Sequence, residues 1–216
     1  MTQVTVVDYG AGNLLSVVRA LSHVGAEVRV TQRAEDIAAA GRLVLPGVGA
    51  FADCMQALRQ LSLVEPLRAY LMAGRPYLGI CVGMQVLFEV GEEYGEHEGL
   101  GIMAGRVVRI PPQDGRGQSL KIPHIGWSPL CPARGQDWAE TPLAPLAGDM
   151  PRDVYFVHSY MAQPSHGDDC LAKVQYHGLS ICAAVRRGQV YGVQFHPEKS
   201  GASGLSILKQ FIAGVP

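Results

Sequence analysis

The chain has 216 residues, 48% of them hydrophobic and 17% charged, which favours one globular domain over residues 1–216 and excludes a disordered chain. Its formal net charge of −1 argues against nucleic-acid binding, because nucleic-acid-binding proteins carry a basic surplus. The five cysteines include no C-x-x-C pair, so neither a disulfide framework nor a metal site is predicted. The sequence has neither a signal-peptide pattern nor an uncharged apolar run of ~18 residues, which predicts a cytoplasmic protein without a membrane segment.

The first half of the chain alternates short apolar runs with helical periodicity. Apolar runs predict buried strands over 4–7, 26–31, 42–46 and 76–80. Helical spacing predicts one helix between Asn13, as its N-cap, and Gly25. A second helix is predicted between Pro66 and Gly74. Strands separated by helices form βαβ units, so we expect a parallel sheet with helices on both faces.

The second half of the chain is richer in strands. Closely spaced strand-like segments lie at 105–111, 153–160, 171–176, 180–186 and 189–195. Turn-like sequences at 176–179 and 186–189 predict hairpins, the four prolines of 131–150 predict a loop or insertion, and a helix over 205–212 closes the chain. The expected fold class is α/β, a mixed, mostly parallel sheet with an antiparallel extension.

The segment Gly79-Ile-Cys-Val-Gly83 joins a predicted strand to a helix-like stretch over 86–90. A nucleophile on such a turn has strained backbone angles, and a glycine two residues to either side relieves the crowding. The thiol would sit at a helix N-terminus, which favours a thiolate, so Cys81 is predicted to be a nucleophile. The alternative is a buried structural cysteine. The other cysteines lack this context: Cys182 lies in a predicted strand, Cys54 in a predicted helix, and Cys131 and Cys170 in predicted loops.

The best-placed base for this thiol is His196, at the end of the predicted strand 189–195. Pro197 keeps the preceding residue extended, so His196 and Glu198 can project to the same side and the carboxylate can fix the imidazole tautomer. The alternative is a turn histidine beside a surface acid. The predicted triad is Cys81, His196 and Glu198. His158, in an apolar strand, is expected to be a buried histidine that at most supports the site.

The loop Pro46-Gly-Val-Gly-Ala-Phe51 follows a predicted strand and has the glycines of an oxyanion loop. Acyl transfer needs backbone N–H donors aimed at the developing oxyanion, and we expect them from Val82 and from Val48 or Gly49. Taken alone, the loop is an ordinary βα turn. Gly10-Ala-Gly-Asn-Leu-Leu15 fails as a dinucleotide-binding motif because leucine stands where the third glycine belongs, so no cofactor is predicted.

Two segments, Gly79–Gln85 and Phe195–Glu198, resemble the signature motifs of the class I, triad-type glutamine amidotransferases. The resemblance implies a flavodoxin-like α/β fold and an enzyme that hydrolyses L-glutamine. Cys81 would attack the carboxamide and release ammonia, leaving a glutamyl thioester. Water activated by His196 would then release glutamate.

Five further segments are similar to the glutaminase subunits of imidazole glycerol phosphate synthases: 8–13, 46–51, 121–127, 156–160 and 196–201. That resemblance implies a heterodimer with a (β/α)8-barrel cyclase subunit, to which ammonia passes through a channel. The products would be imidazole glycerol phosphate, for histidine biosynthesis, and an aminoimidazole carboxamide ribotide.

The same resemblance implies roles for residues outside the triad. Glutamine would be held by Gln85, Glu93, Ser159 and Tyr160. The partner would meet Ala11, Gly12, Asn13, Trp127 and Lys199. Glu93 would pair with the α-ammonium group; the alternative is one of several solvated acids. The chain departs from the family at Val82, where Leu is usual, and at Ser128, where Asn is common, so no partner contact is assigned to residue 128.

Three alternatives stay open at this point: a cysteine hydrolase on the same type of fold, a non-catalytic binding subunit, and another class I amidotransferase of the anthranilate or guanylate type. The hydrolase would release no ammonia from glutamine and need no partner. The complete triad argues against the binding subunit, and segments 121–127 and 156–160 argue against the other amidotransferases.

Overall fold

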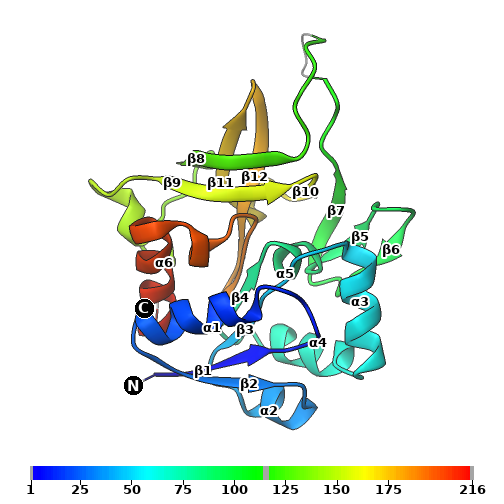
Figure 1. The fold of residues 1–216 in the computed structure, drawn as a ribbon, viewed down its shortest axis with the longest axis vertical. Helices are drawn as coiled ribbons and strands as arrows, with labels where there is room; N and C mark the ends of the chain where they lie inside the picture. Colours follow the sequence, from blue (N-terminus) through cyan, green and yellow to red (C-terminus); the bar gives the residue numbers. More distant parts are fainter. Residues whose placement is uncertain (1, 114–116, 215–216) are drawn as a thin grey trace.

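A computed structural model describes residues 2–113 and 117–214 (Figure 1). Its sheet contains a run of parallel strands in the order β2, β1, β3, β4 and β13, which span Ala26–Thr31, Thr2–Val7, Leu43–Leu45, Tyr77–Ile80 and Val190–Val193. This is the strand order of a flavodoxin-like, doubly wound sheet, and it confirms the predicted fold class.

Helices cover both faces of the parallel strands (Figure 1). On one face α1 (Leu14–His23) packs against α6 (Gly201–Ala213), and on the other α2 (Ala34–Ala39) and α3 (Phe51–Gln60) pack against α4 (Val64–Met72). The two faces arise because the right-handed crossovers from β1 to β2 and from β2 to β3 run in opposite directions. Strands β3, β4 and β13 are therefore buried along their whole length, as their continuous apolar sequences predict.

Beyond β13 the sheet continues as the predicted antiparallel extension. The order is β12 (Leu179–Arg187), β10 (Tyr160–Pro164), β7 (Met103–Arg109), β5 (Phe88–Gly91) and β6 (His97–Glu98). In this extension only β5 and β7 pair in parallel among the described residues. A branch leads from β12 through β11 (Cys170–Tyr176) and β8 (His124–Pro132) to β9 (Asp153–His158). The end of β9 and the residues after it form a wall over the ends of β4 and β13, which defines one side of a cavity.

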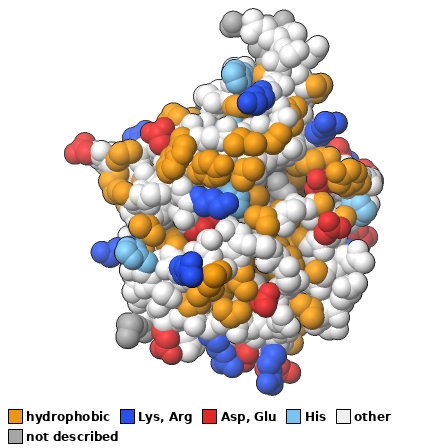
Figure 2. Space-filling view, viewed as in Figure 1, with side chains coloured by type: hydrophobic (Ala, Val, Ile, Leu, Met, Phe, Trp, Pro, Cys, Tyr) orange, Lys and Arg blue, Asp and Glu red, His pale blue; other side chains and the backbone are white. Residues whose placement is uncertain are grey.

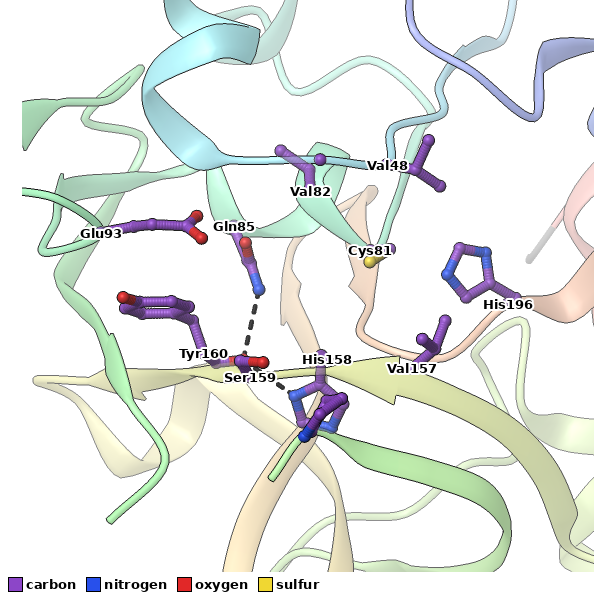
Figure 3. Close-up of a pocket in the computed structure, with 12 residues that line it drawn as sticks. Val48, Cys81, Val82, Gln85, Glu93, Val157, His158, Ser159, Tyr160 and His196 are labelled. Carbon is purple, nitrogen blue, oxygen red and sulfur yellow. Dashed lines mark hydrogen bonds between the residues drawn. The ribbon is translucent and has the colours of Figure 1, made fainter. Parts of the chain in front are cut away.

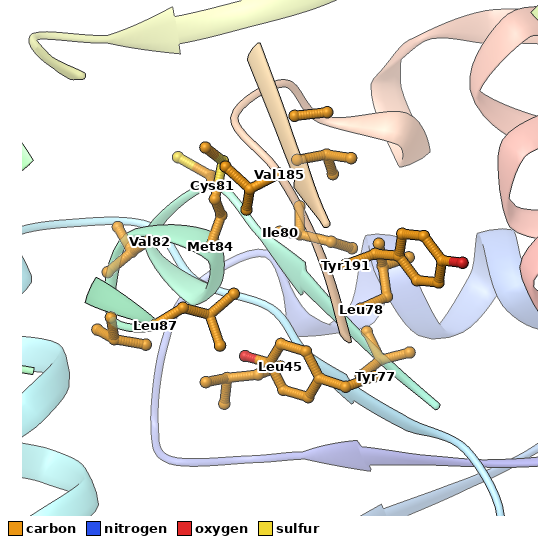
Figure 4. Packing of buried hydrophobic residues seen from close by; sticks show 14 of the residues in the cluster. Leu45, Tyr77, Leu78, Ile80, Cys81, Val82, Met84, Leu87, Val185 and Tyr191 are labelled. Atoms are coloured by element: carbon orange, nitrogen blue, oxygen red, sulfur yellow. The ribbon is translucent and has the colours of Figure 1, made fainter. Parts of the chain in front are cut away.

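The short helix α5 (Val82–Gln85) is anchored in the apolar core (Figure 4). Met84 and Leu87 pack with Leu45, Leu78 and Ile80, and each of these side chains is at most 1% exposed. Burying an aliphatic side chain of this size stabilises a fold by about 1.5–3 kcal/mol. The segment that follows β4 is therefore held firmly against the sheet.

Three local expectations are wrong. Residues 86–90 do not continue a helix: α5 ends at Gln85, and β5 pairs with β7 and buries Phe88 completely. Cys131 and Cys170 lie in strands β8 and β11 rather than in loops. Strand β8 itself was missed, because its glycine and two prolines are typical of a loop.

The proline-rich stretch 131–150 is mostly outside strands, as predicted, but it packs against the core. After β8 its one regular element is a single 3₁₀ turn, Ala144–Ala147. Trp138 is 1% exposed, and its indole Nε1 donates a hydrogen bond of 3.1 Å to the Leu171 carbonyl. The stretch is therefore a packed connection rather than a solvated insertion.

Candidate active site

Cys81 occupies the sharp turn between β4 and α5. Its backbone has φ 53° and ψ −108°, a left-handed conformation that costs a non-glycine residue about 1–3 kcal/mol. Two backbone hydrogen bonds hold the turn. The Cys81 N–H donates to the Val193 carbonyl at 2.7 Å, and the Cys81 carbonyl accepts from the backbone N–H of Gln85 at 3.1 Å. The strained strand-to-helix turn that the sequence predicts at Cys81 is therefore present, and it is called the elbow below.

The two glycines of the motif are required by close backbone contact. A Cβ atom on Gly83 would lie 1.9 Å from the Leu45 carbonyl oxygen, and one on Gly79 would lie 2.2 Å from the Gly83 oxygen. Both contacts are with backbone, which cannot move aside as a side chain can. The elbow can therefore press against β3 and β4 only while both positions lack a side chain.

His196 and Glu198 lie in the segment after β13, and Figure 3 shows the His196 ring beside Cys81. His196 Nδ1 and Glu198 Oε1 are 2.7 Å apart, and both side chains are at most 1% exposed. Burial disfavours the imidazolium, but interactions with Cys81 and Glu198 outweigh it and raise the pKa of His196 to about 9. Nε2 makes no hydrogen bond of ordinary geometry to the described residues. It is free to exchange a proton beside the sulfur.

Asn13 occupies the N-cap position of helix α1, as the sequence predicts, but its side chain does not cap the helix. It adopts φ 72°, which Asn tolerates better than most residues, and makes no capping hydrogen bond. Its Nδ2 instead donates to Glu198 Oε1 at 2.6 Å. One carboxylate oxygen thus receives both the Asn13 amide and the His196 imidazole, and this holds the acid in place.

One cavity of about 340 Å³ opens beside Cys81 (Figure 3). Its lining consists of Val48, Gly49, Cys81, Val82, Gln85, Glu93, Ser159, Tyr160 and His196, together with Pro123, Val157 and His158. The structure therefore brings together every residue predicted as an oxyanion donor or glutamine ligand. The residues predicted to meet a partner lie outside this lining: Ala11, Gly12, Asn13, Trp127 and Lys199.

The loop after β3 lies tightly against the elbow. A Cβ atom on Gly47 would come within 2.4 Å of the Tyr9 hydroxyl and 3.1 Å of the Val82 Cβ. Gly49 has φ 104°, which only glycine adopts without strain. Val48, Gly49 and Val82, whose backbone N–H groups are the predicted oxyanion donors, all line the cavity.

Glu93 is not simply a solvated acid. Its Oε2 accepts a hydrogen bond of 3.0 Å from the amide of Phe51, the first residue of α3, while the carboxylate also lines the cavity. An acid at a helix N-terminus is favoured by the helix dipole. Glu93 thus places a fixed negative charge at the cavity wall and ties that wall to the loop after β3.

The sequence reasoning missed a buried pair of histidines behind the cavity. His124 Nδ1 and His158 Nε2 are 3.1 Å apart, and His158 Nδ1 donates to the Tyr160 carbonyl at 2.8 Å. Burial lowers the pKa of each histidine to about 4, so both are neutral at pH 7. His158 was expected to be buried. His124 lies in the family-like segment 121–127, but no role was assigned to it, because the strand that carries it was not recognised.

The described residues also bear on the requirements of a metal site and of a membrane-spanning helix. Among residues 2–113 and 117–214, no group of three or more His, Cys, Asp or Glu side chains is placed to hold a metal ion. Within the same ranges, no helix is both long and apolar enough to span a lipid bilayer.

Comparison with known proteins identifies relatives along nearly the whole chain. The family model for glutamine amidotransferase class-I matches residues 5–215. The imidazole glycerol phosphate synthase subunit HisH 1 of Legionella pneumophila (strain Lens) is 48% identical over 213 residues, covering 98% of this chain and 99% of the relative. Subunit HisH of Geobacillus thermodenitrificans is 45% identical over 212 residues, covering 98% and 96%.

Solved structures show the same fold at lower identity. A crystal structure of a glutamine amidotransferase has a TM-score of 0.70 at 21% identity, covering 98% of this chain and 99% of that one. The PurLQS structure of Thermotoga maritima also gives 0.70, at 17% identity, with 99% and 98% covered. At these identities the likeness extends to the fold alone.

We expect Gly83→Ala to destabilise the protein by about 1–3 kcal/mol or more, because its Cβ would overlap the Leu45 carbonyl. Gly148→Ala is the matched control, since a Cβ there would meet nothing within 4 Å. Urea unfolding followed by circular dichroism measures both. Equal stability of the two variants would contradict the steric account of the elbow.

The buried histidines predict an acid-sensitive component of stability. A histidine whose pKa falls from 6.5 to about 4 on folding contributes stability that is complete above pH 6.5 and is lost as the pH falls toward 4. His124→Phe keeps a ring for stacking on Phe156 and removes one such group. The free energy of unfolding of this variant should fall less than that of the wild type between pH 6.5 and 4. Parallel pH profiles would contradict the assignment.

Proposed function

The chain belongs to the class I glutamine amidotransferases, as a glutaminase subunit of imidazole glycerol phosphate synthase in histidine biosynthesis, and we propose that Cys81, His196 and Glu198 are the triad that hydrolyses its glutamine. The observation that carries this assignment is the shared cavity, in which the strained cysteine faces a buried histidine held by a carboxylate. We further propose that residues 1–216 act as one domain, in the cytoplasm, where thiols such as its free cysteines stay reduced.

The geometry supports acyl transfer in two halves. The Cys81 thiolate attacks the carboxamide carbon of glutamine, and the carbonyl oxygen gains negative charge facing the N–H of Val82 and that of Val48 or Gly49. His196 gives its proton to the amide nitrogen, the C–N bond breaks, and ammonia leaves. A glutamyl thioester remains on Cys81.

The second half returns the enzyme to its starting state. His196 Nε2, now neutral, takes a proton from water, and the resulting hydroxide attacks the thioester carbon. The C–S bond breaks, glutamate leaves, and the thiolate is restored beside the imidazolium. Glu198 holds the ring in the tautomer that keeps Nε2 available in this half.

The remaining lining residues fit the two ends of glutamine. Glu93 supplies the negative charge that would meet the α-ammonium group. Gln85, Ser159 and Tyr160 add polar groups to the lining. We propose these four residues as the glutamine ligands.

The face around the cavity mouth supports a protein partner. Trp127 and Ile125 of β8 are each 55% exposed, and Leu15 is 59% exposed. Figure 2 shows hydrophobic side chains gathered in a band across this face. Exposed apolar groups of this size are typical of an interface. We propose that a (β/α)8-barrel cyclase subunit covers this face, meets Ala11, Gly12, Asn13, Trp127 and Lys199, and receives the ammonia.

The direct test measures glutamate release from glutamine by the purified chain, alone and with the barrel subunit and its nucleotide ligand. We expect weak activity alone and strong stimulation in the complex, because the peptide N–H groups after Gly47 must be aimed at the oxyanion. Cys81→Ala should lower the activity by roughly 10³-fold or more.

Cys131→Ala is the matched control, because its sulfur lies in β8 and donates only to the Lys173 carbonyl. Hydrolysis retained by Cys81→Ala would rule out the assigned nucleophile. Full activity without the barrel subunit would rule out activation by assembly, and the absence of ammonia release under all conditions would favour the cysteine hydrolase alternative.

A further inference from the structure

A buried glutamine lies directly against the nucleophile. Gln194 stands between the end of β13 and Phe195, and its side chain is 0% exposed. Its Nε2 lies 3.6 Å from Cys81 Sγ, within hydrogen-bond reach of sulfur. Its Oε1 accepts a hydrogen bond of 3.0 Å from Gln85 Nε2. The amide thus connects the reactive sulfur to a residue that lines the cavity.

The orientation of the Gln194 amide is fixed by its neighbours. Gln85 Nε2 carries two N–H groups, and it faces two acceptors, Gln194 Oε1 and the Tyr160 carbonyl at 3.3 Å. If the Gln194 amide were flipped, its NH₂ would face the NH₂ of Gln85 and its oxygen would face the sulfur. Only the observed orientation lets every group pair, so an N–H points at Cys81.

The chain of hydrogen bonds extends behind the cavity. The Tyr160 carbonyl also accepts from His158 Nδ1 at 2.8 Å, so this carbonyl is held from two sides. Because both N–H groups of Gln85 are engaged, its Oε1 is the atom left to meet a ligand, and it points away from Tyr160 (Figure 3). Gln85 therefore presents an acceptor to the cavity and holds Gln194 at the same time.

We propose that Gln194 is a catalytic residue whose amide N–H stabilises the Cys81 thiolate, with Gln85 setting its orientation. The proposal deepens the proposed function and rests on it, since it concerns the nucleophile of that reaction. A charge-assisted hydrogen bond from N–H to a thiolate is stronger than the same bond to a neutral thiol. The thiolate appears twice in the reaction, as nucleophile and as leaving group, so the donor acts in both halves.

The other groups around the sulfur do not replace this donor. Burial raises the pKa of Tyr9 well above its usual value and that of Cys54 to about 12, so neither group brings a charge to the sulfur at pH 7. The Tyr9 hydroxyl makes no hydrogen bond of ordinary geometry to the described residues. His196, backed by Glu198, supplies a positive charge but must give its proton away when ammonia leaves. The neutral Gln194 amide keeps its proton throughout. It can therefore stabilise the sulfur at the stage when His196 is uncharged.

The test compares the alkylation of Cys81 by iodoacetamide in the wild type and in Gln194→Met. Methionine has a similar length but offers no N–H donor. In the reaction the thiolate displaces iodide and forms a thioether, which is measured on the Cys81 peptide by mass spectrometry across pH. We expect the alkylation rate at pH 7 to fall about 10-fold and its pH profile to move about one unit upward.

Gln175→Met is the matched control, because Gln175 lies exposed in β11 and hydrogen-bonds Ser180; it should alkylate like the wild type. Should Gln194→Met fail to fold, Gln85→Met carries the test, since loss of its N–H groups releases the Gln194 amide and should shift the profile in the same direction. An unchanged rate and profile in the folded variant would overturn the proposal. Alkylation needs no glutamine, so the two proposals are tested separately. A wild type that releases no glutamate would contradict the proposed function, whereas the comparison of alkylation rates alone decides the role of Gln194.

Discussion

The active-site geometry depends on one steric constraint, the contact of α5 with the backbone of β3 and β4. Gly83 lies so close to the Leu45 carbonyl that no side chain fits, and Gly79 lies almost as close to the Gly83 carbonyl. The chain must therefore turn sharply at Cys81, in a left-handed conformation. This turn lifts the sulfur to the strand ends, where open α/β sheets bind ligands. The apolar core around α5 offsets the strain.

Two histidines that line the cavity differ in charge, because different groups surround them. His196 and His158 are both buried, and burial lowers the pKa of each. In His196 the carboxylate of Glu198 and the Cys81 sulfur reverse the outcome, and the pKa rises to about 9. His158 meets a carbonyl and a neutral histidine, so burial prevails. Of these two histidines, only His196 is therefore charged at pH 7.

The sequence predicted the features that local motifs encode. These features depend on residues close together in the chain. They are the glycines around Cys81, the Pro197 that separates His196 from Glu198, and the order of strands and helices. Contacts between residues far apart in the sequence could not be predicted. Asn13 binds Glu198, 185 residues away in the chain, and Gln194 contacts Cys81, 113 residues away. The helix expected after Gln85 fails for a related reason, because pairing of β5 with β7 overrides the local periodicity.

The central claim is that Cys81 is the nucleophile that attacks glutamine in this cavity. Its most direct test uses a chloroketone analogue of L-glutamine, in which the reactive carbon replaces the amide nitrogen, followed by peptide mass spectrometry. The structure predicts one modified residue, Cys81, with protection by added glutamine. Modification of a different residue, or labelling of Cys81 that glutamine does not slow, would contradict the account.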